Sequence, residues 1–115
     1  MFKKDHADWI RFRLLTPTPL EIDYHAEEGA YDRLDYYERM EKVYTGALKI
    51  LRDSQNRGDK WVMFIHGHST SQPGATTSRS QIRKLMRSPD ATPYIIRREC
   101  IEHPTVFVAA IRPGP

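Results

Sequence analysis

The sequence predicts a single two-layer α/β domain, in which a mixed sheet is built around a strand–helix–strand unit and carries two helices. Two observations predict this fold class. The chain has 115 residues, which is enough for one domain with one core. Along it, short apolar runs of strand length alternate with two longer segments whose apolar residues recur every three or four positions. That alternation is typical of helices packed on a sheet.

The first part of the chain is expected to be an extension, residues 1–19, that precedes a domain spanning residues 20–112. Residues 9–15 alternate apolar and basic side chains, which predicts an edge strand or a docking arm. The two prolines within residues 16–19 each remove an amide donor and fix a φ angle. This short segment is therefore predicted to be an extended connector.

A strand, a long helix and a second strand form the expected core of the domain. Residues 20–25 are predicted to be a short strand, and residues 31–56 carry apolar side chains at helical spacing. Gly58 is the glycine expected just beyond the end of this helix. Residues 61–65 are an unbroken apolar run, typical of a central strand buried on both faces. The two strands of such a unit are expected to be parallel, with a right-handed crossover.

The second half of the chain is predicted to add a polar loop, a second helix and two strands. The loop covers residues 66–77, and the helix covers residues 78–87, with its apolar and basic side chains on opposite sides. Residues 94–96 and 105–111 are predicted to be strands that pair in antiparallel orientation.

Composition limits the class of protein. No segment approaches the roughly 18 unbroken apolar residues of a membrane helix. Acidic residues within the first eight positions argue against a signal peptide. The single cysteine, Cys100, cannot form an intramolecular disulfide, which favours a reducing compartment. We therefore expect a cytoplasmic protein that does not use a membrane as a partner.

The positive charge is concentrated in the second half of the chain. Residues 1–58 contain 10 Lys and Arg against 11 Asp and Glu, whereas residues 59–115 contain 8 against 4. The first half therefore carries a net charge of −1 and the second half +4. Several of the bases lie on the helix predicted at residues 78–87, and a basic surface of this kind suits a polyanion such as nucleic acid.

Histidines are expected at the carboxyl ends of the two parallel strands, the edge at which α/β sheets bind ligands. Asp23 and His25 lie two residues apart and share one face of the first strand. His66 follows the second strand, and Gly67 lets the backbone turn and a ligand approach closely. A carboxylate beside two imidazoles can supply a general base, a proton donor and an orienting charge. We therefore expect Asp23, His25 and His66 to form a catalytic site.

The loop and helix that follow are expected to bind phosphate. Small and polar loop residues lead into a helix whose first amides are unpaired, which is a favourable position for an anion. The basic side of the same helix continues this cationic surface. The expected phosphate-binding residues are Gly67, His68, Ser69, Thr70, Ser71, Arg79, Arg83, Lys84 and Arg87.

Two short motifs resemble those of the Smr (small MutS-related) domain family. Residues 22–25, Ile-Asp-Tyr-His, are similar to the Asp-x-His motif that closes the first strand of that family. Residues 66–71, His-Gly-His-Ser-Thr-Ser, are similar to its second motif, His-Gly-x-Gly-x-Gly, with Ser69 and Ser71 in place of the later glycines. The helix and the last strand follow in the order of the family, so the resemblance covers about residues 20–112.

The resemblance implies both a fold and a function. The implied fold is related to the C-terminal domain of bacterial translation initiation factor three. The implied function is nucleic-acid binding, often with endonuclease activity on DNA or RNA. On this resemblance, Asp23 and His25 match the catalytic Asp-x-His, and His66 and Gly67 match the start of the second motif.

The residues and the resemblance together lead to one functional hypothesis and two alternatives. We expect an Smr-like protein that binds nucleic acid and cleaves phosphodiester bonds in RNA or DNA by His/Asp acid–base chemistry. RNA cleavage through the ribose 2′-hydroxyl needs no cofactor, whereas DNA would require water as the nucleophile, for which a divalent metal is an option. One alternative is a nucleic-acid-binding module without catalysis. The other is a metal-dependent hydrolase whose ion is held by Asp23, His25, His66 and His68.

Overall fold

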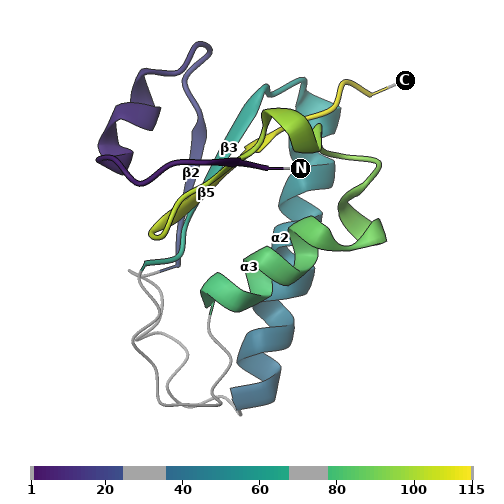
Figure 1. Cartoon of the computed structure of the whole chain (residues 1–115). Coiled ribbons are helices and arrows are strands. Elements are labelled where there is room, and N and C mark those ends of the chain that lie inside the picture. Colours follow the sequence, from purple (N-terminus) through teal and green to yellow (C-terminus); the bar gives the residue numbers. More distant parts are fainter. Residues whose placement is uncertain (1, 25–35, 68–77, 115) are drawn as a thin grey trace.

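The structure of the chain is a computed structural model, and it describes residues 2–24, 36–67 and 78–114. Within these ranges the chain forms strands, two α-helices and short 3-10 helices around one sheet (Figure 1). The strands are β1 (Lys3–Lys4), β2 (Leu20–Asp23), β3 (Trp61–Ile65), β4 (Ile101–Glu102) and β5 (Val106–Ala110). The helices are α2 (Tyr36–Arg57), α3 (Ser78–Arg87) and the 3-10 helices η1 (Trp9–Leu14), η3 (Pro89–Ala91) and η4 (Arg97–Glu99).

The sheet is mixed, and its strand order is β1-β4-β5-β3-β2. Strands β2 and β3 are parallel neighbours, in a register that runs from Leu20 opposite Val62 to Asp23 opposite Ile65. Strand β5 is antiparallel to both β3 and β4, and β1 is parallel to β4. The predicted α/β domain with a mixed sheet and a parallel strand–helix–strand unit is therefore confirmed.

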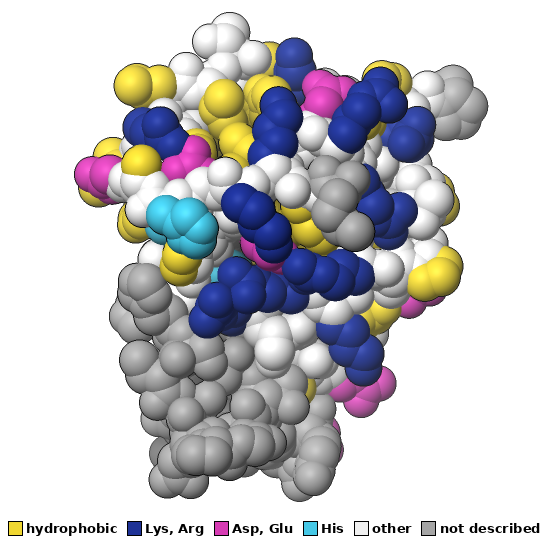
Figure 2. All heavy atoms as spheres, in the orientation of Figure 1, with side chains coloured by type: hydrophobic (Ala, Val, Ile, Leu, Met, Phe, Trp, Pro, Cys, Tyr) yellow, Lys and Arg dark blue, Asp and Glu magenta, His cyan; other side chains and the backbone are white. Residues whose placement is uncertain are grey.

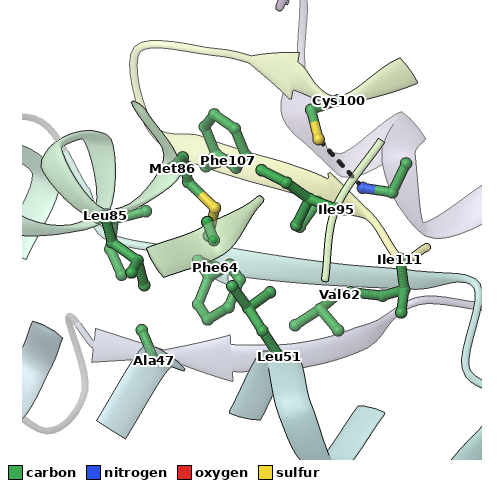
Figure 3. Close-up of a cluster of buried hydrophobic side chains, with 14 of the residues drawn as sticks. Ala47, Leu51, Val62, Phe64, Leu85, Met86, Ile95, Cys100, Phe107 and Ile111 are labelled. Atoms are coloured by element: carbon green, nitrogen blue, oxygen red, sulfur yellow. Dashed lines mark hydrogen bonds between the residues drawn. The ribbon is translucent and has the colours of Figure 1, made fainter. Parts of the chain in front are cut away.

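Both α-helices cover the same face of the sheet, and the main core lies between them and the strands (Figures 1 and 3). Alternate residues of β3, Val62 and Phe64, point to this face because side chains alternate along a strand. On α2, Ala47 and Leu51 are four residues apart and therefore meet the sheet together. Burying one such large apolar side chain stabilises the fold by about 1.5–3 kcal/mol. The fully buried side chains of α3 are Ile82, Leu85 and Met86.

The opposite face of the sheet is covered by η1, and this corrects the edge strand predicted for residues 9–15. The side chain of Asp8 caps η1 by accepting a hydrogen bond from the amide of Ile10. A 3-10 helix places every third residue on one side, so Trp9, Phe12 and Leu15 pack together against β3 and β5. The apolar residues that made the sequence look like a strand, Ile10 and Leu14, are exposed instead.

The antiparallel strand predicted at residues 94–96 is reduced to a single bridge, flanked by hydrogen bonds from Ile96 to Ala110 and from Arg112 to Tyr94. The amide of Tyr94 closes a turn onto Ala91, and Ile95 makes only an isolated antiparallel bridge with Ile111. The guanidinium of Arg97 donates to backbone carbonyls at the end of α3, which draws this segment into turns and η4. The strand that pairs with β5 at this edge is β4, a few residues later.

The other predicted helices and strands agree with the structure within the residues that it describes, although β2 ends at Asp23 instead of residue 25. Helix α3 has the predicted bounds, and β5 lies within the predicted residues 105–111. Helix α2 ends at Arg57, and Gly58 follows with a φ of 80°, the left-handed conformation expected of a glycine at this position. Neither α-helix in the described parts of the chain combines the length and the apolar character that crossing a membrane requires.

Candidate functional site

The structure places β2 and β3 side by side, so the ends of the two strands meet as the sequence predicted. Asp23, the last residue of β2, lies opposite Ile65, the last residue of β3. Of the predicted phosphate-binding residues, Gly67 and the bases of α3 belong to the described parts of the chain. The predicted site residues outside the described residues are His25, His68, Ser69, Thr70 and Ser71.

Asp23 and His66 belong to opposite faces of the sheet. Because side chains alternate along a strand, Asp23 shares the face of Ile65, which η1 covers, whereas His66 belongs to the face that the helices cover. The pKa of Arg13 on η1 agrees with this placement of Asp23. It is raised first by a hydrogen bond with Glu21 and then by the negative charges of Glu21 and Asp23, so Asp23 lies near η1. The register therefore separates Asp23 from the imidazole with which it was expected to form one site.

His66 is held rigidly just beyond the end of β3. The amides of His66 and Gly67 both donate to the carbonyl of Thr105, at 3.1 and 2.9 Å. Gly67 has a φ of 74°, and this turn brings its carbonyl to 2.8 Å from Nδ1 of His66. A carbonyl oxygen can only accept, so Nδ1 carries the proton and Nε2 carries the lone pair of the neutral ring.

The second ring nitrogen of His66 is buried without a partner. The residue is 4% exposed, and Nε2 has no hydrogen bond to any described residue. Leaving a buried acceptor unsatisfied costs about 1–3 kcal/mol. Such a group in a folded protein is explained by a bound water or ion, by strain or by a catalytic role.

The surroundings of His66 keep its ring neutral. Burial lowers the pKa of His66 to about 4, because a charged imidazolium is poorly solvated there. The hydrogen bond to Gly67 opposes this shift, while the positive charges of Arg83 and Arg79, and then His103, add to it. At neutral pH the ring is thus an uncharged hydrogen-bond acceptor among cations.

Helix α3 supplies those cations. Arg79, Arg83 and Arg87 recur every four residues and therefore follow one side of the helix. Figure 2 shows Lys and Arg side chains gathered over α3 on this face of the molecule. Lys84 belongs to a different side of the helix, where its Nζ lies 5.8 Å from the centre of the Tyr44 ring of α2.

A buried carboxylate, Glu102, holds several of these bases. Glu102 is 4% exposed and lies opposite Phe107 in the sheet, which directs it to the helix-covered face. Its Oε2 lies 2.6 Å from Arg87 and 3.7 Å from Arg83, and its Oε1 is paired with Lys4 of β1. Burial would raise the pKa of Glu102, but these hydrogen bonds and charges outweigh it and lower the pKa. We define the cationic cluster as Lys4, Arg79, Arg83, Arg87 and Glu102.

The cationic cluster has an excess of positive charge and of hydrogen-bond donors, since it contains four bases and one carboxylate, and Lys4, Arg83 and Arg87 are the bases paired with it. The Nε atoms of Arg79 and Arg83 are buried, and neither makes a hydrogen bond to a described residue. Burial, together with the charges of Arg79 and Arg87, also lowers the pKa of Arg83, whereas Glu102 opposes this shift. Guanidinium donors of this kind match the planar oxygen pairs of phosphate and carboxylate groups.

Sequence reasoning missed Glu102 and Lys4. Each lies in a strand of two residues, which is too short to produce a periodic pattern. The pairing of β1 with β4 sets Lys4 opposite Glu102, although 98 residues separate them along the chain. Only the positions of the α3 bases could be anticipated from the sequence, because their spacing is local.

His103 provides a contrast with His66. Its Nε2 donates to the carbonyl of Ala7, and its Nδ1 accepts from the amide of Thr105 at 3.0 Å. Both ring nitrogens are therefore satisfied, and the ring packs edge-on against Phe12. His103 is a structural residue on the face that η1 covers.

The metal-site alternative drew on four residues, of which only Asp23 and His66 are described, and these two belong to opposite faces of the sheet. Within the described ranges, no three His, Cys, Asp or Glu side chains converge as metal ligands would. Cys100, the single cysteine, is buried near β5, where the amide of Ala110 donates to its Sγ at 3.4 Å (Figure 3). Burial raises its pKa to about 11, so the thiol is protonated and inert at neutral pH.

The candidate site thus consists of a neutral, buried histidine acceptor beside a group of arginine donors. This combination suits a ligand that carries negative oxygens together with a proton to donate or to lose. Comparisons of the chain with protein-family models, with curated proteins and with solved structures found no match.

Proposed function

We propose that this chain is an Smr-like protein that binds nucleic acid and cleaves its phosphodiester bonds, with the site at His66 and the cationic cluster. The observation that carries the proposal is the buried, unpartnered Nε2 of His66 beside the arginines of α3. The arginines supply donors for phosphate oxygens, and the histidine supplies an acceptor for the proton of an attacking hydroxyl.

The arginines are assigned to phosphate binding. The Nε atoms of Arg79 and Arg83 make no hydrogen bond to a described residue, so both can donate to the non-bridging oxygens of a phosphodiester. As the transition state forms, negative charge grows on those same oxygens. Fixed cations in a partly buried site stabilise that charge more strongly than water does.

His66 is assigned to proton abstraction. In the free protein its pKa of about 4 makes it a weak base. A bound phosphate brings negative charge next to the ring, and this favours the protonated form and raises the pKa. Substrate binding therefore strengthens the base at the moment when it is needed. Asp23 belongs to the other face of the sheet, so we assign this role to His66 alone among the described residues.

The surface around the site suits a long polyanion. Lys84 is exposed on α3, and Lys3 is exposed on β1, so the positive surface extends beyond the cationic cluster (Figure 2). A nucleic-acid backbone that passes over these bases releases counterions, so its affinity falls steeply with salt concentration.

Cleavage of labelled RNA and DNA tests the catalytic assignment. His66→Asn keeps a donor near the position of Nδ1 but removes the acceptor at Nε2. We expect cleavage to fall by about 100-fold or more, the usual contribution of a general base, while salt-dependent binding through the arginines remains. His6→Asn, a change at an exposed histidine, is the control and should leave cleavage intact. Equal cleavage by wild type and His66→Asn would refute the assignment.

Binding measured at several salt concentrations tests the cationic cluster separately. Arg79→Gln should weaken binding and reduce the slope of log affinity against log salt by about one. Arg13→Gln, at a base on the opposite face, serves as the matched control and should change neither quantity. If both variants behave alike, the nucleic-acid surface lies elsewhere.

A binding module without catalysis is the second candidate, and the burial of His66 favours it. Only 4% of the residue is exposed, so an attacking hydroxyl can reach the ring only if neighbouring side chains move. Salt-dependent binding by the wild type without any cleavage product would select this candidate.

A further inference from the structure

We infer that the site recognises a ribose 2′-hydroxyl beside a phosphate, so that its substrate is RNA and not DNA. The inference rests on the proposed function and deepens it by naming the class of nucleic acid. It depends on the hydrogen-bonding roles of three buried nitrogens, Nε2 of His66 and Nε of Arg79 and Arg83, none of which makes a hydrogen bond to a described residue.

The first of these nitrogens can only accept a hydrogen bond. Nδ1 of His66 is occupied at 2.8 Å by the carbonyl of Gly67, which fixes the tautomer of the neutral ring. The backbone at this position is anchored by the Gly67 amide, which donates to the carbonyl of Thr105 at 2.9 Å. A phosphodiester group carries acceptors only, so it cannot satisfy Nε2. A ligand that completes the site must bring a donor.

The other two nitrogens can only donate. Arg79 and Arg83 need acceptors, and the charges of the two side chains repel each other in a partly buried setting. An anionic oxygen satisfies both needs at once. The three nitrogens taken together therefore match a group that has negative oxygens and a hydroxyl next to them.

RNA carries this pair of groups at every nucleotide, because the 2′-hydroxyl is on the carbon next to the one that bears the 3′-phosphate. DNA has the phosphate and lacks the hydroxyl. A protein site arranged to hydrogen-bond a hydroxyl rejects the analogue without it strongly, by as much as 10⁴- to 10⁵-fold, because its buried polar group is then left unpaired. His66 is such a group.

The His66 residue is 4% exposed, so a ligand reaches the ring only when neighbouring side chains move. The side chain of Arg83 is 28% exposed. Its Nε lies 3.7 Å from Oε2 of Glu102, which is too far for a hydrogen bond. A phosphate at the surface is thus a better partner for its guanidinium than the one it has. The positive charge of Arg83 already acts on the His66 ring, so a phosphate bound by Arg83 lies in the surroundings of Nε2.

The resulting reaction balances without a further reactant. The 2′-oxygen attacks phosphorus as its proton passes to Nε2 of His66, and the bond from phosphorus to the 5′-oxygen of the next nucleotide breaks. The leaving oxygen takes a proton from water, and the imidazolium returns its proton to the solvent. The products are a 2′,3′-cyclic phosphate and a 5′-hydroxyl end.

The test compares three oligonucleotides of one sequence: RNA, DNA, and RNA with a single 2′-O-methyl group at the nucleotide where cleavage occurs. We expect the RNA to be cut and to yield a cyclic phosphate that mass spectrometry detects. The DNA should remain intact, and the methyl group should slow cleavage at its own position by about 100-fold or more. Cleavage of DNA, or of the methylated bond, at a rate close to that of RNA would overturn the inference while leaving the proposed nuclease in place.

Binding provides a second readout that does not depend on catalysis. Wild type should bind RNA at least about tenfold more tightly than DNA, and His66→Asn should bind the two equally. Equal binding of RNA and DNA by wild type would overturn the inference. Failure to bind either would overturn the proposed function as well.

Inorganic phosphate is the other ligand to test, because it also combines negative oxygens with a hydroxyl. A competition experiment with RNA shows which of the two the site recognises. It should compete only weakly with RNA. If phosphate binds and RNA does not, the hydroxyl that the site recognises belongs to a phosphate monoester, and the RNA inference is wrong.

Discussion

Lowering the pH from 6.5 towards 4 is expected to destabilise the folded chain through His66. The pKa of this residue is about 4 in the folded state, whereas an unfolded histidine has a pKa near 6.5. Between these values the unfolded chain binds a proton that the folded chain does not, so stability falls as the pH falls. Each pKa unit corresponds to about 1.4 kcal/mol, so the full effect is about 3 kcal/mol.

The direction of this shift follows from the groups that face the ring. Burial is the largest cause, and the positive charges of Arg83 and Arg79 from α3, followed by His103, act in the same direction. Only the hydrogen bond to the carbonyl of Gly67 favours the protonated ring. Above pH 6.5 both states are neutral at this position, so the penalty disappears.

Urea unfolding at several pH values measures the effect, with His66→Asn as the reference. The pKa of Glu102 is lowered, so protonation of its carboxylate also costs stability as the pH falls, but this loss occurs in both proteins and cancels. We expect wild type to lose about 3 kcal/mol more than the variant between pH 6.5 and 4. An equal pH dependence of the two proteins, or an NMR titration that places the pKa of His66 near 6.5, would refute the reasoning.

Two further predictions concern the cationic cluster and the end of α2. Removing one partner of a buried ion pair costs about 3–5 kcal/mol, and Glu102→Gln should fall at the lower end because Lys4 and Arg87 are half exposed. Urea unfolding measures this, and a loss below about 1 kcal/mol would mean that water already solvates these charges. Gly58→Ala should destabilise by about 1–2 kcal/mol because of its φ of 80°, whereas Gly46→Ala, inside α2 with open space around it, should stabilise by up to about 1 kcal/mol. Thermal melts of the two alanine variants that shift in the same direction would contradict this.

Several elements could be predicted because their signals are local. An unbroken apolar run identified β3, helical spacing identified α3 with its bounds, and Gly58 marked the end of α2. Each of these signals depends on neighbours within one or two turns of chain. The parallel pairing of β2 with β3 followed from the order of the elements, since a helix joins them.

Other elements were mispredicted because two periods fitted the same residues. Residues 9–15 fit a strand at period two and a 3-10 helix at period three. The helix is the one that packs Trp9 and Leu15 beside Phe12 and leaves Ile10 and Leu14 exposed. Strands β1 and β4 are two residues long, so they exist only because each pairs with a neighbour. No local sequence pattern predicts a strand of two residues.

The site divides in the same way. The sequence alone located His66, the turn at Gly67 and the basic side of α3, because a polar motif after an apolar strand and a four-residue spacing are visible along the chain. Folding determined which groups share a face: the strand register sends Asp23 to the other side of the sheet, and the pairing of distant strands brings Glu102 and Lys4 to the arginines. Burial of the His66 ring, on which its neutral state depends, likewise comes from side chains that meet only in three dimensions.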